Sequence, residues 1–530
     1  MTGKKRILSG DEAVAHAALA CGLTLGSGYP GTPSTEILET VSSLGGEAEW
    51  SPNEKVALEV GIGVSFAGGR SLVTMKHVGL NVAADPLFTL TYTGVRGGLV
   101  LVSADDPGMA SSQNEQDNRH YARAAKLPML EPSDSQEAYD YALRAFELSE
   151  EFKVPVLLRM TTRVCHSRAP VCLWKDPEAR REETRHEKEI QTRVMIPAFA
   201  KKAHVRLEET MKQIAERNET SDLNIVFGDN PELGIITSGV AFEHVMEAFP
   251  QASILKLGTT WPLPYRKIGE FARSVKRAVV VEESDRFLEE NLRAAGIAVE
   301  GKADAFLYGE LNVERVRKLL AGDETPEPPQ KPGRPPQLCP GCPHRKTFEM
   351  LRDLGCIVSG DIGCYTLGVL PPFNAMDCSV CMGASIGVGL GLRHSLSETD
   401  ARKVVSVIGD STFLHSGLTG IVEMVYNKPA TGHLVLILDN STTAMTGLQE
   451  HAATGRHINL SPAPKVKLED LCTAAGVDHV DIADPVTEHE KFVDLIRTRL
   501  ASNDTSVIIV RRPCILQMKK LAKLNRKAQS

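Results

Sequence analysis

Three features are scarce in this 530-residue chain, and each shortage excludes a class of protein. Aromatic residues make up only 5% of the chain, so no aromatic cage for a ligand is visible. No apolar run is long enough to cross a membrane, and the first residues, MTGKKRILSGDEA, lack the apolar core of a signal peptide. The net charge is −7, which gives no electrostatic basis for binding nucleic acid. We therefore expect a cytoplasmic protein with no membrane span and no nucleic-acid partner.

The rest of the composition is that of a soluble globular protein, with 42% hydrophobic and 24% charged residues. A chain of this length exceeds what one hydrophobic core supports, so about two to four domains are expected. Eleven cysteines in a cytosolic protein indicate metal or redox chemistry rather than a disulfide framework.

Short β-branched runs alternate with helical segments, which is the pattern of α/β domains with parallel sheets. The expected strands include Leu72–Met75, Gly98–Val102, Val154–Leu158, Leu233–Ser238, Ala252–Leu257, Arg277–Glu282, Val404–Ile408, His433–Leu438 and Val507–Val510. The predicted domains are 1–195, a smaller α/β domain at 220–322, and 339–516, with a Pro-rich linker at 323–338 and a basic tail at 517–530. The charge-dense segment Glu178–Glu189 is expected to be a solvated helix or a linker.

Polar residues follow two neighbouring strands of the last domain. Gly409, Asp410 and Ser411 end the first strand, and Asn440 and Thr442 follow the second. In open α/β sheets ligands bind at this edge. A carboxylate, an amide oxygen and the Thr442 carbonyl are suitable Mg²⁺ ligands beside a diphosphate. The spacing resembles the thiamin-diphosphate motif, GDG followed about thirty residues later by Asn, with Ser411 in place of the last glycine. The alternative is an ordinary strand-end Asp and a loop Asn.

Two candidate catalytic residues lie near the N-terminus. Thr32, in the rigid loop GYPGTPSTE, either presents its hydroxyl to a ligand or caps the next helix, with Pro33 in its first turn. Glu54 begins the helix Asn53–Ala67, where an acid ordinarily stabilises the helix dipole. A thiamin enzyme also needs one buried carboxylate against the aminopyrimidine ring. Glu54 is the first choice for that role, and Glu59 is the second.

A polar stretch from Asp105 to Gln116 follows another strand and is either an active-site loop or a solvated surface loop.

The cysteines suggest a second site. Cys339 and Cys342 form a CxxC, which suits zinc, a redox dithiol or an iron–sulfur cluster. Cys378 and Cys381 could complete a zinc site. Cys364, after Gly363, and Cys514 each follow a strand, so both could meet the CxxC loop at one sheet edge; the remaining alternative is that these cysteines are simply buried.

Several long motifs occur together in one order: GYPGTPSTE, NEKVALEVGIG, TMKHVGLNVAADPL, SADDPGMASSQNEQD, CPGCPHR, GDIGCYTLG, GDSTFLHSG and LDNSTTAMTG. This combination, from about Leu8 to Cys514, resembles the thiamin-dependent 2-oxoacid:ferredoxin oxidoreductases, and among them the alpha subunits of the indolepyruvate type. The resemblance implies two thiamin-diphosphate-binding parallel-sheet domains, one for the pyrimidine (1–195) and one for the diphosphate (339–516), plus a smaller transketolase C-terminal-like domain.

The same resemblance implies roles for single residues and for partners. Glu54 would be the activating carboxylate, Thr32 would lie near the substrate, and Gly363 and Cys364 would lie beside the cofactor. Cys339, Cys342, Cys364 and Cys514 would ligate one 4Fe–4S cluster. The reaction would be oxidative decarboxylation of an arylpyruvate to its acyl-coenzyme A, with electrons passing to ferredoxin or another iron–sulfur or flavin acceptor. A smaller beta or gamma-type subunit would complete a heterotetramer.

One departure from the family bears on the electron path. The 16 residues after Cys514 contain no cysteine, whereas members of this type usually continue into a ferredoxin-like tail, so we expect the later electron carriers on a partner. Two alternative functions stay open. A non-oxidative thiamin-dependent 2-oxoacid decarboxylase would need no cluster and would form an aldehyde without an electron acceptor. A non-catalytic assembly subunit would bind no thiamin diphosphate.

Overall fold

The computed structural model describes residues 4–178, 187–327 and 336–529. The chain divides into two compact units, Met1–Pro329 and Gln330–Ser530. Within the described residues, every helix is either too short or too polar to cross a membrane.

The first unit is built on a seven-stranded sheet, which is parallel except at one edge strand. Side chains of alternating residues enter two separate cores, Val100 and Val102 on one face and Leu99 and Leu101 on the other, so both faces are buried. This explains why these strands are continuous apolar runs. In spatial order the strands are β12 (Thr259–Trp261), β6 (Met129–Leu130), β7 (Val156–Thr161), β5 (Leu99–Asp105), β4 (Ser71–Lys76), β2 (Leu25–Gly28) and β3 (Ala48–Trp50).

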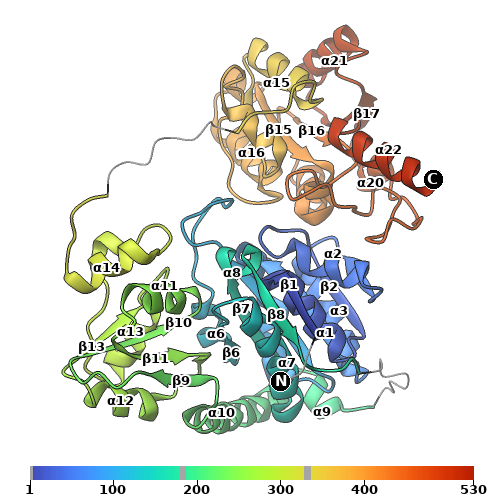
Figure 1. The fold of residues 1–530 in the computed structure, drawn as a ribbon. Coiled ribbons are helices and arrows are strands. Elements are labelled where there is room, and N and C mark those ends of the chain that lie inside the picture. The colour runs from blue at the N-terminus through green and yellow to red at the C-terminus, as the bar shows by residue number, and fades with distance from the viewer. Residues whose placement is uncertain (1–3, 179–186, 328–335, 530) are drawn as a thin grey trace. The chain divides into compact units, whose positions relative to one another are not determined.

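Helices cover both faces of this sheet (Figure 1). An antiparallel pair, β1 (Lys4–Ser9) and β8 (Arg168–Leu173), forms a separate two-stranded sheet. The helices are α1 (Gly10–Ala20), α2 (Thr35–Ser43), α3 (Glu54–Phe66), α4 (His77–Val82), α5 (Ala84–Thr93), α6 (Arg119–Ala125), α7 (Ser135–Phe152), α8 (Thr162–His166), α9 (Ile190–Arg193) and α10 (Pro197–Glu219).

The same unit contains a four-stranded sheet in the predicted smaller domain. Its strand order is β13 (Arg277–Val281), β10 (Leu233–Ser238), β11 (Ser253–Leu257) and β9 (Asn224–Phe227), of which β9 is antiparallel. Its helices are α11 (Val240–Ala248), α12 (Tyr265–Arg273), α13 (Phe287–Ala294), η1 (Asp304–Phe306) and α14 (Val313–Ala321).

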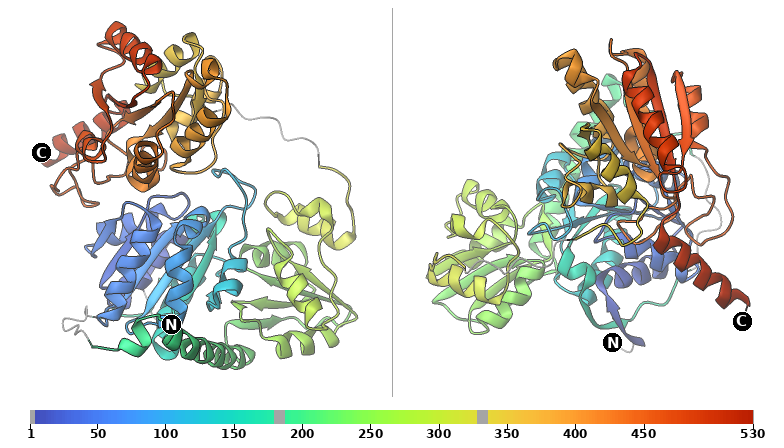
Figure 2. Two further views of the ribbon diagram at one scale, coloured as in Figure 1. Left: turned by 180° about the vertical axis from the view of Figure 1, so that it is seen from behind. Right: turned by 90° about the horizontal axis from the view of Figure 1, so that it is seen from above.

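The second unit contains a five-stranded, fully parallel sheet with helices on both faces (Figure 2). The strand order is β14 (Ile357–Ser359), β15 (Val404–Gly409), β16 (His433–Asp439), β18 (Thr505–Arg511) and β17 (His479–Ala483). Its helices are α15 (His344–Asp353), η2 (Cys364–Val369), α16 (Ala384–Ser395), α17 (Glu398–Ala401), α18 (Asp410–Thr412), the π-helix η3 (Phe413–Gly417), α19 (Leu418–Tyr426), α20 (Leu468–Ala474), α21 (His489–Ala501) and α22 (Ile515–Gln529). The mixed α/β fold with several parallel-sheet domains agrees with the sequence analysis.

Three local predictions need correction. Thr32 does not cap α2, because the helix begins at Thr35, and the Ser34 hydroxyl donates to the Gly31 carbonyl at 3.0 Å. The apolar spacing of Phe413–Tyr426 predicts a helix over those residues, but the helix begins earlier, at Asp410, and it contains a π-helical turn. Residues 517–529 of the predicted basic tail belong to α22, which starts at Ile515 inside the predicted domain.

Two further predictions fall largely outside the described residues. Most of the charge-dense segment Glu178–Glu189 and residues 328–335 of the predicted linker are not described. The described parts of the linker, 323–327 and 336–338, contain neither helix nor strand.

Candidate functional site

Asp410 anchors the polar edge of the parallel sheet in the second unit. The residue follows β15 directly, and it is 2% exposed. Its Oδ1 accepts from the Ser411 amide at 3.0 Å, and its Oδ2 accepts from the Ser441 amide at 2.8 Å. The Asn440–Thr442 loop that follows β16 is therefore fastened to the carboxylate that follows β15, as the strand-end spacing predicted.

The Asn440 side chain is held in a turn at the end of β16. Its Oδ1 accepts from the Thr442 amide at 3.1 Å, and its Nδ2 lies 3.2 Å from Nε2 of His344. The Ser411 and Thr443 hydroxyls lie 2.8 Å apart, which ties the same two strand ends together again. The sequence-predicted residues Asp410, Ser411, Asn440 and Thr442 thus lie in one hydrogen-bonded cluster.

This edge of the sheet has excess negative charge. Asp439 is buried beside Asp410. Burial is the main cause that raises the pKa of Asp439, and the Asp410 charge is the second. Arg511, whose Nε lies 2.7 Å from Asp439 Oδ2, lowers this pKa. On the other side, Asp410 Oδ2 lies 3.3 Å from Nε2 of His451. Two adjacent buried carboxylates with oxygen donors nearby suit a divalent cation, so these residues fit the Mg²⁺ and diphosphate that the motif implies.

The π-helix immediately after this cluster is also typical of functional sites. It spans Phe413–Gly417, and its His415 side chain is buried. Thr412 donates to the Ile362 carbonyl at 3.0 Å, which links the start of this helix to the GDIGC segment containing Gly363.

The four predicted cluster cysteines line one cavity of about 110 Å³. Cys339, Cys342, Cys364 and Cys514 come from three separate segments and meet there with His344 and Asn440. The CxxC turn is closed by a hydrogen bond from the Cys342 amide to the Cys339 carbonyl at 3.0 Å, with Gly341 in the left-handed region at φ 76°.

Burial dominates the acidity of these thiols. Burial, followed by the charge of neighbouring cysteines, raises the pKa of Cys364 to about 12, and burial raises the pKa of Cys342 to about 11. A positive metal centre would reverse this, because a coordinating thiol is deprotonated. Four thiols around a largely apolar cavity therefore fit a metal cluster.

The spacing of the sulfurs bears on which metal would fit. Sulfurs on one zinc ion lie about 3.8 Å apart, given a Zn–S bond of about 2.3 Å in a tetrahedron. Within residues 4–178, 187–327 and 336–529, no three cysteine sulfurs lie within 4.8 Å of one another. The thiols as placed therefore do not have the spacing of a single tetrahedral zinc site.

The rival ligands Cys378 and Cys381 lie elsewhere. Cys378 donates to the Ser359 hydroxyl at an S–O distance of 3.7 Å, and Cys381 is exposed. Neither lines the cavity.

In the first unit, the structure distinguishes the two acids considered for the activating role. Glu54 is 5% exposed at the start of α3, which Asn53 caps by accepting from the Val56 amide at 2.9 Å. Its carboxylate packs against Gly79 of α4, where a β-carbon would lie 2.6–2.9 Å from its Cγ, Oε1 and Cδ. Glu59 is exposed and pairs with Lys55. Glu54 therefore has the burial that the role requires, and Glu59 does not.

Thr32 is half-buried in the loop after β2. A β-carbon on the preceding Gly31 would meet the Lys76 side chain at 3.0 Å, so this loop lies against the end of β4. Burial lowers the pKa of Lys76, whose ammonium donates to the Ser111 carbonyl at 2.8 Å.

The polar stretch Asp105–Gln116 is hydrogen-bonded near both ends, while residues 108–111, 113 and 114 are exposed. Asp106 accepts from the Ser111 amide at 2.8 Å and from the Ser112 hydroxyl at 2.5 Å, and Gln116 donates to the His77 carbonyl at 3.0 Å. These bonds fold the loop over the end of β4.

Two histidines of the second-unit site escaped the sequence analysis, His344 and His451. His344 is 4% exposed, and burial lowers its pKa to about 4, so it is neutral at pH 7. Their only sequence signal is proximity to CPGC, Asn440 and the LDNSTT stretch, which does not reveal that they face the same cluster.

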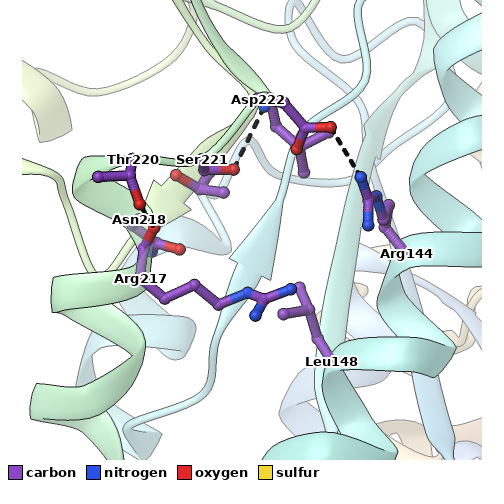
Figure 3. Close-up of a pocket in the computed structure, with 9 residues that line it drawn as sticks. Arg144, Leu148, Arg217, Asn218, Thr220, Ser221 and Asp222 are labelled. Atoms are coloured by element: carbon purple, nitrogen blue, oxygen red, sulfur yellow. Dashed lines mark hydrogen bonds and ion pairs between the residues drawn. The ribbon is translucent and has the colours of Figure 1, made fainter.

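A separate hollow of about 280 Å³ lies in the first unit, where the end of α10 meets α7 (Figure 3). Arg144 points toward Asp222, with Nη2 2.7 Å from Oδ2, and Arg217 pairs with Glu151 at 2.9 Å. Both arginines are thus already paired, and none of the predicted site residues lines this hollow.

Two family models match the chain. Residues 16–225 match "Pyruvate flavodoxin/ferredoxin oxidoreductase, thiamine diP-bdg", and residues 361–510 match "Thiamine pyrophosphate enzyme, C-terminal TPP binding domain". The second match contains Asp410, Asn440 and Thr442, and the first contains Thr32 and Glu54.

Similar proteins share nearly the whole chain. An indolepyruvate oxidoreductase subunit IorA of Archaeoglobus fulgidus is 42% identical over 97% of this chain and 87% of that protein. The subunit of the same name from Pyrococcus horikoshii is 39% identical over 97% of this chain and 86% of that protein. Among solved structures, 2-oxoglutarate:ferredoxin oxidoreductase from Magnetococcus marinus matches with a TM-score of 0.52 and 17% identity, covering 61% of this chain and 66% of that chain, which shows a shared fold.

Proposed function

The chain belongs to the IorA family of indolepyruvate oxidoreductase subunits, within the thiamin-diphosphate-dependent 2-oxoacid:ferredoxin oxidoreductases, and from this premise we propose that it is the catalytic subunit of such an enzyme. The proposed reaction is oxidative decarboxylation of an arylpyruvate of the indolepyruvate type to its acyl-coenzyme A. Electrons leave through one 4Fe–4S cluster to ferredoxin or to an acceptor on a partner subunit.

The observation that carries this proposal is the direct link between the cysteine cavity and the diphosphate motif. The Cys514 amide donates to the Asn440 carbonyl at 2.9 Å, and Asn440 itself lines the cavity. A cluster bound there would share one loop with the cofactor's metal site. A non-oxidative decarboxylase would have no use for that arrangement.

In the second unit, Asp410, the Asn440 side chain and the Thr442 carbonyl would hold Mg²⁺, and the Gly409–Ser411 turn would accommodate the diphosphate. Thiamin diphosphate, when bound, supplies the electron sink for decarboxylation, and the protein orients it. His344, neutral at pH 7, would keep the Asn440 amide oriented without adding positive charge beside the metal.

In the first unit, Glu54 would hydrogen-bond the ring nitrogen of the aminopyrimidine and shift its tautomer, so that the cofactor becomes able to lose its own proton. Support comes from its burial and from the close fit against Gly79, which fixes the position of the carboxylate. Thr32 would donate its hydroxyl to the substrate, supported by its place on a strand-end loop.

The similar proteins are named as subunits, so we infer that a partner subunit completes the enzyme, and we propose a smaller partner in a heterotetramer. Coenzyme A would enter as the acyl acceptor.

The test uses the complex of this chain with its partner subunit, purified anaerobically and supplied with thiamin diphosphate, coenzyme A and a redox dye. Indolepyruvate, phenylpyruvate, pyruvate and 2-oxoglutarate are compared as substrates. We expect one acyl-coenzyme A for every two electrons delivered to the dye, with arylpyruvates as the preferred substrates. A Cys364→Ser variant should lose dye reduction, whereas Cys381→Ser, at an exposed site away from the cavity, should not.

Aldehyde released without any acceptor would contradict the oxidative reaction. Failure of the complex to bind thiamin diphosphate in calorimetry would indicate an assembly subunit instead.

A further inference from the structure

Three potential metal ligands converge in the first unit, away from every residue assigned above. Asp11 lies in the first turn of α1, Glu36 in the first turn of α2, and His166 is the last residue of α8. One ligand atom from each lies within 4.8 Å of the other two. Glu36 is the last residue of the GYPGTPSTE motif, but Asp11 and His166 lie in none of the motifs, and the three residues are spread over more than 150 positions.

Asp11 is the unusual member of the group. It is fully buried, at 0% exposure, and neither of its carboxylate oxygens accepts a hydrogen bond of ordinary geometry; its polar neighbours are the Glu36 carboxyl group and the weakly donating Cys165 thiol. A buried carboxylate without such hydrogen bonds is costly, and native structures rarely contain one without a reason.

The surroundings of Asp11 add no compensating positive charge. Burial and then the neighbouring Glu36 raise its pKa well above the usual range, and Glu12 acts in the same direction. The Arg168 guanidinium, which lines the same hollow, pairs with Glu12 at 2.5 Å. A cation held between Asp11 and Glu36 would offset this repulsion.

We propose that Asp11, Glu36 and His166 bind a first-row divalent transition-metal ion. Two carboxylates and one imidazole form a mixed oxygen and nitrogen set that suits Mn²⁺, Fe²⁺ or Zn²⁺ better than Mg²⁺, which avoids imidazole.

The setting leaves room for the rest of a coordination shell. A hollow of about 370 Å³ borders the trio, and it is lined by Glu36 and His166 together with Glu39 and Thr40. Water entering from this side can complete four or six ligands, while Asp11 binds from the buried side. Glu36 and His166 are exposed side chains, so both can adjust toward an ion held by Asp11.

The ion would link three helices, α1, α2 and α8, of which α8 is distant in the sequence from the other two. It would fasten the first turn of α2, which begins three residues after Thr32. The site would thus stabilise the segment that leads out of the predicted substrate loop. The metal assignment itself does not depend on the role of Thr32.

The test measures Mn²⁺ binding by electron paramagnetic resonance, in which free Mn²⁺ gives a six-line signal that bound ion loses. The full chain is used without thiamin diphosphate, so that the Asp410 site lacks the diphosphate oxygens it needs. Mn²⁺ is chosen over Zn²⁺ because thiolates bind Mn²⁺ poorly, so the cysteine cavity should not contribute to the measured Mn²⁺ binding. The variants are Asp11→Asn, His166→Gln and, as a control on the same hollow, Glu39→Gln.

We expect the wild type and Glu39→Gln to bind one Mn²⁺ more per chain than Asp11→Asn, and His166→Gln to weaken that site at least tenfold. Mn²⁺ should also raise the Tm of the wild type and not that of Asp11→Asn. Equal binding by the wild type and Asp11→Asn would overturn the proposal, as would no binding by the wild type. If Asp11→Asn does not fold, Glu36→Gln and His166→Gln decide in its place, since both residues are exposed and tolerate exchange.

Discussion

Adding one methyl group to α4 should move the carboxylate on which the proposed activation depends. In Gly79→Ala the new β-carbon would lie 2.6 Å from Cγ, 2.7 Å from Oε1 and 2.9 Å from Cδ of Glu54. Ordinary carbon contacts are about 3.5–4.0 Å, so the Glu54 side chain has to retreat by about 1 Å. A misplacement of about 1 Å costs roughly 100-fold in rate where a group must be correctly oriented.

The stability of the variant should change little. Overpacking costs about 1–3 kcal/mol, and the flexible Glu54 side chain places this case at the low end. Replacing a helical glycine with alanine returns about 1 kcal/mol. The expected net loss is therefore about 0–2 kcal/mol, too small to explain a large fall in rate.

Gly63→Ala on α3 is the matched control, because a β-carbon there meets nothing within 4 Å. It should stabilise the fold by up to about 1 kcal/mol and leave the rate unchanged. The assay is steady-state acceptor reduction by the reconstituted complex, with chemical unfolding of each variant. A folded Gly79→Ala enzyme at the wild-type rate would refute the assignment of Glu54, and equal losses in both variants would show a general effect of alanine.

Three further changes test other parts of the account. Glu54→Gln should abolish turnover, whereas Glu59→Gln, a change at an exposed acid, should leave turnover unchanged. An active Glu54→Gln enzyme would show that Glu54 is not the activating carboxylate. Asp410→Asn should lose Mg²⁺ and thiamin diphosphate together on gel filtration, and undiminished cofactor content would contradict its role as a ligand. Lowering the pH should destabilise the fold through the buried His433, because burial lowers the pKa of this imidazole well below its ordinary value. The unfolded chain then takes up the proton first, so the free energy of unfolding falls as the pH drops through about 6.5. Between pH 7 and pH 5 His433 can contribute a loss of at most about 2 kcal/mol in urea unfolding, and the buried His344 adds a loss of its own. His433→Gln should therefore reduce the total loss, the exposed His489→Gln should keep it, and equal losses in all three proteins would exclude His433 as a source.

The strands and the strand-end motif were accessible from sequence because they depend on local pattern. Val404–Gly409 and His433–Asp439 are β-branched runs, and in a parallel sheet their carboxyl ends share one edge whatever else the chain does. That geometry alone brings Asp410 and Asn440 together, and the same argument correctly anticipated that Cys364 and Cys514 meet the CxxC turn.

Other features depend on packing that no local pattern encodes. Glu54 and Glu59 lie on the same helix, and only the position of α4 decides that the first is buried and the second exposed. His344 and Asp11 owe their significance to burial among residues from distant segments. The start of α2 was misplaced because Thr32 is a good capping residue, yet the chain forms a turn through Ser34 before the helix begins.

The central claim is that the cysteine cavity holds a 4Fe–4S cluster, and iron analysis of the anaerobically purified chain tests it most directly. We expect about four irons per chain and, after reduction, the paramagnetic signal of a single cluster. Cys514→Ser should lose the iron and the signal, whereas Cys381→Ser, outside the cavity, should keep both. Zinc in place of iron, or an unchanged cluster signal in Cys514→Ser, would contradict the account.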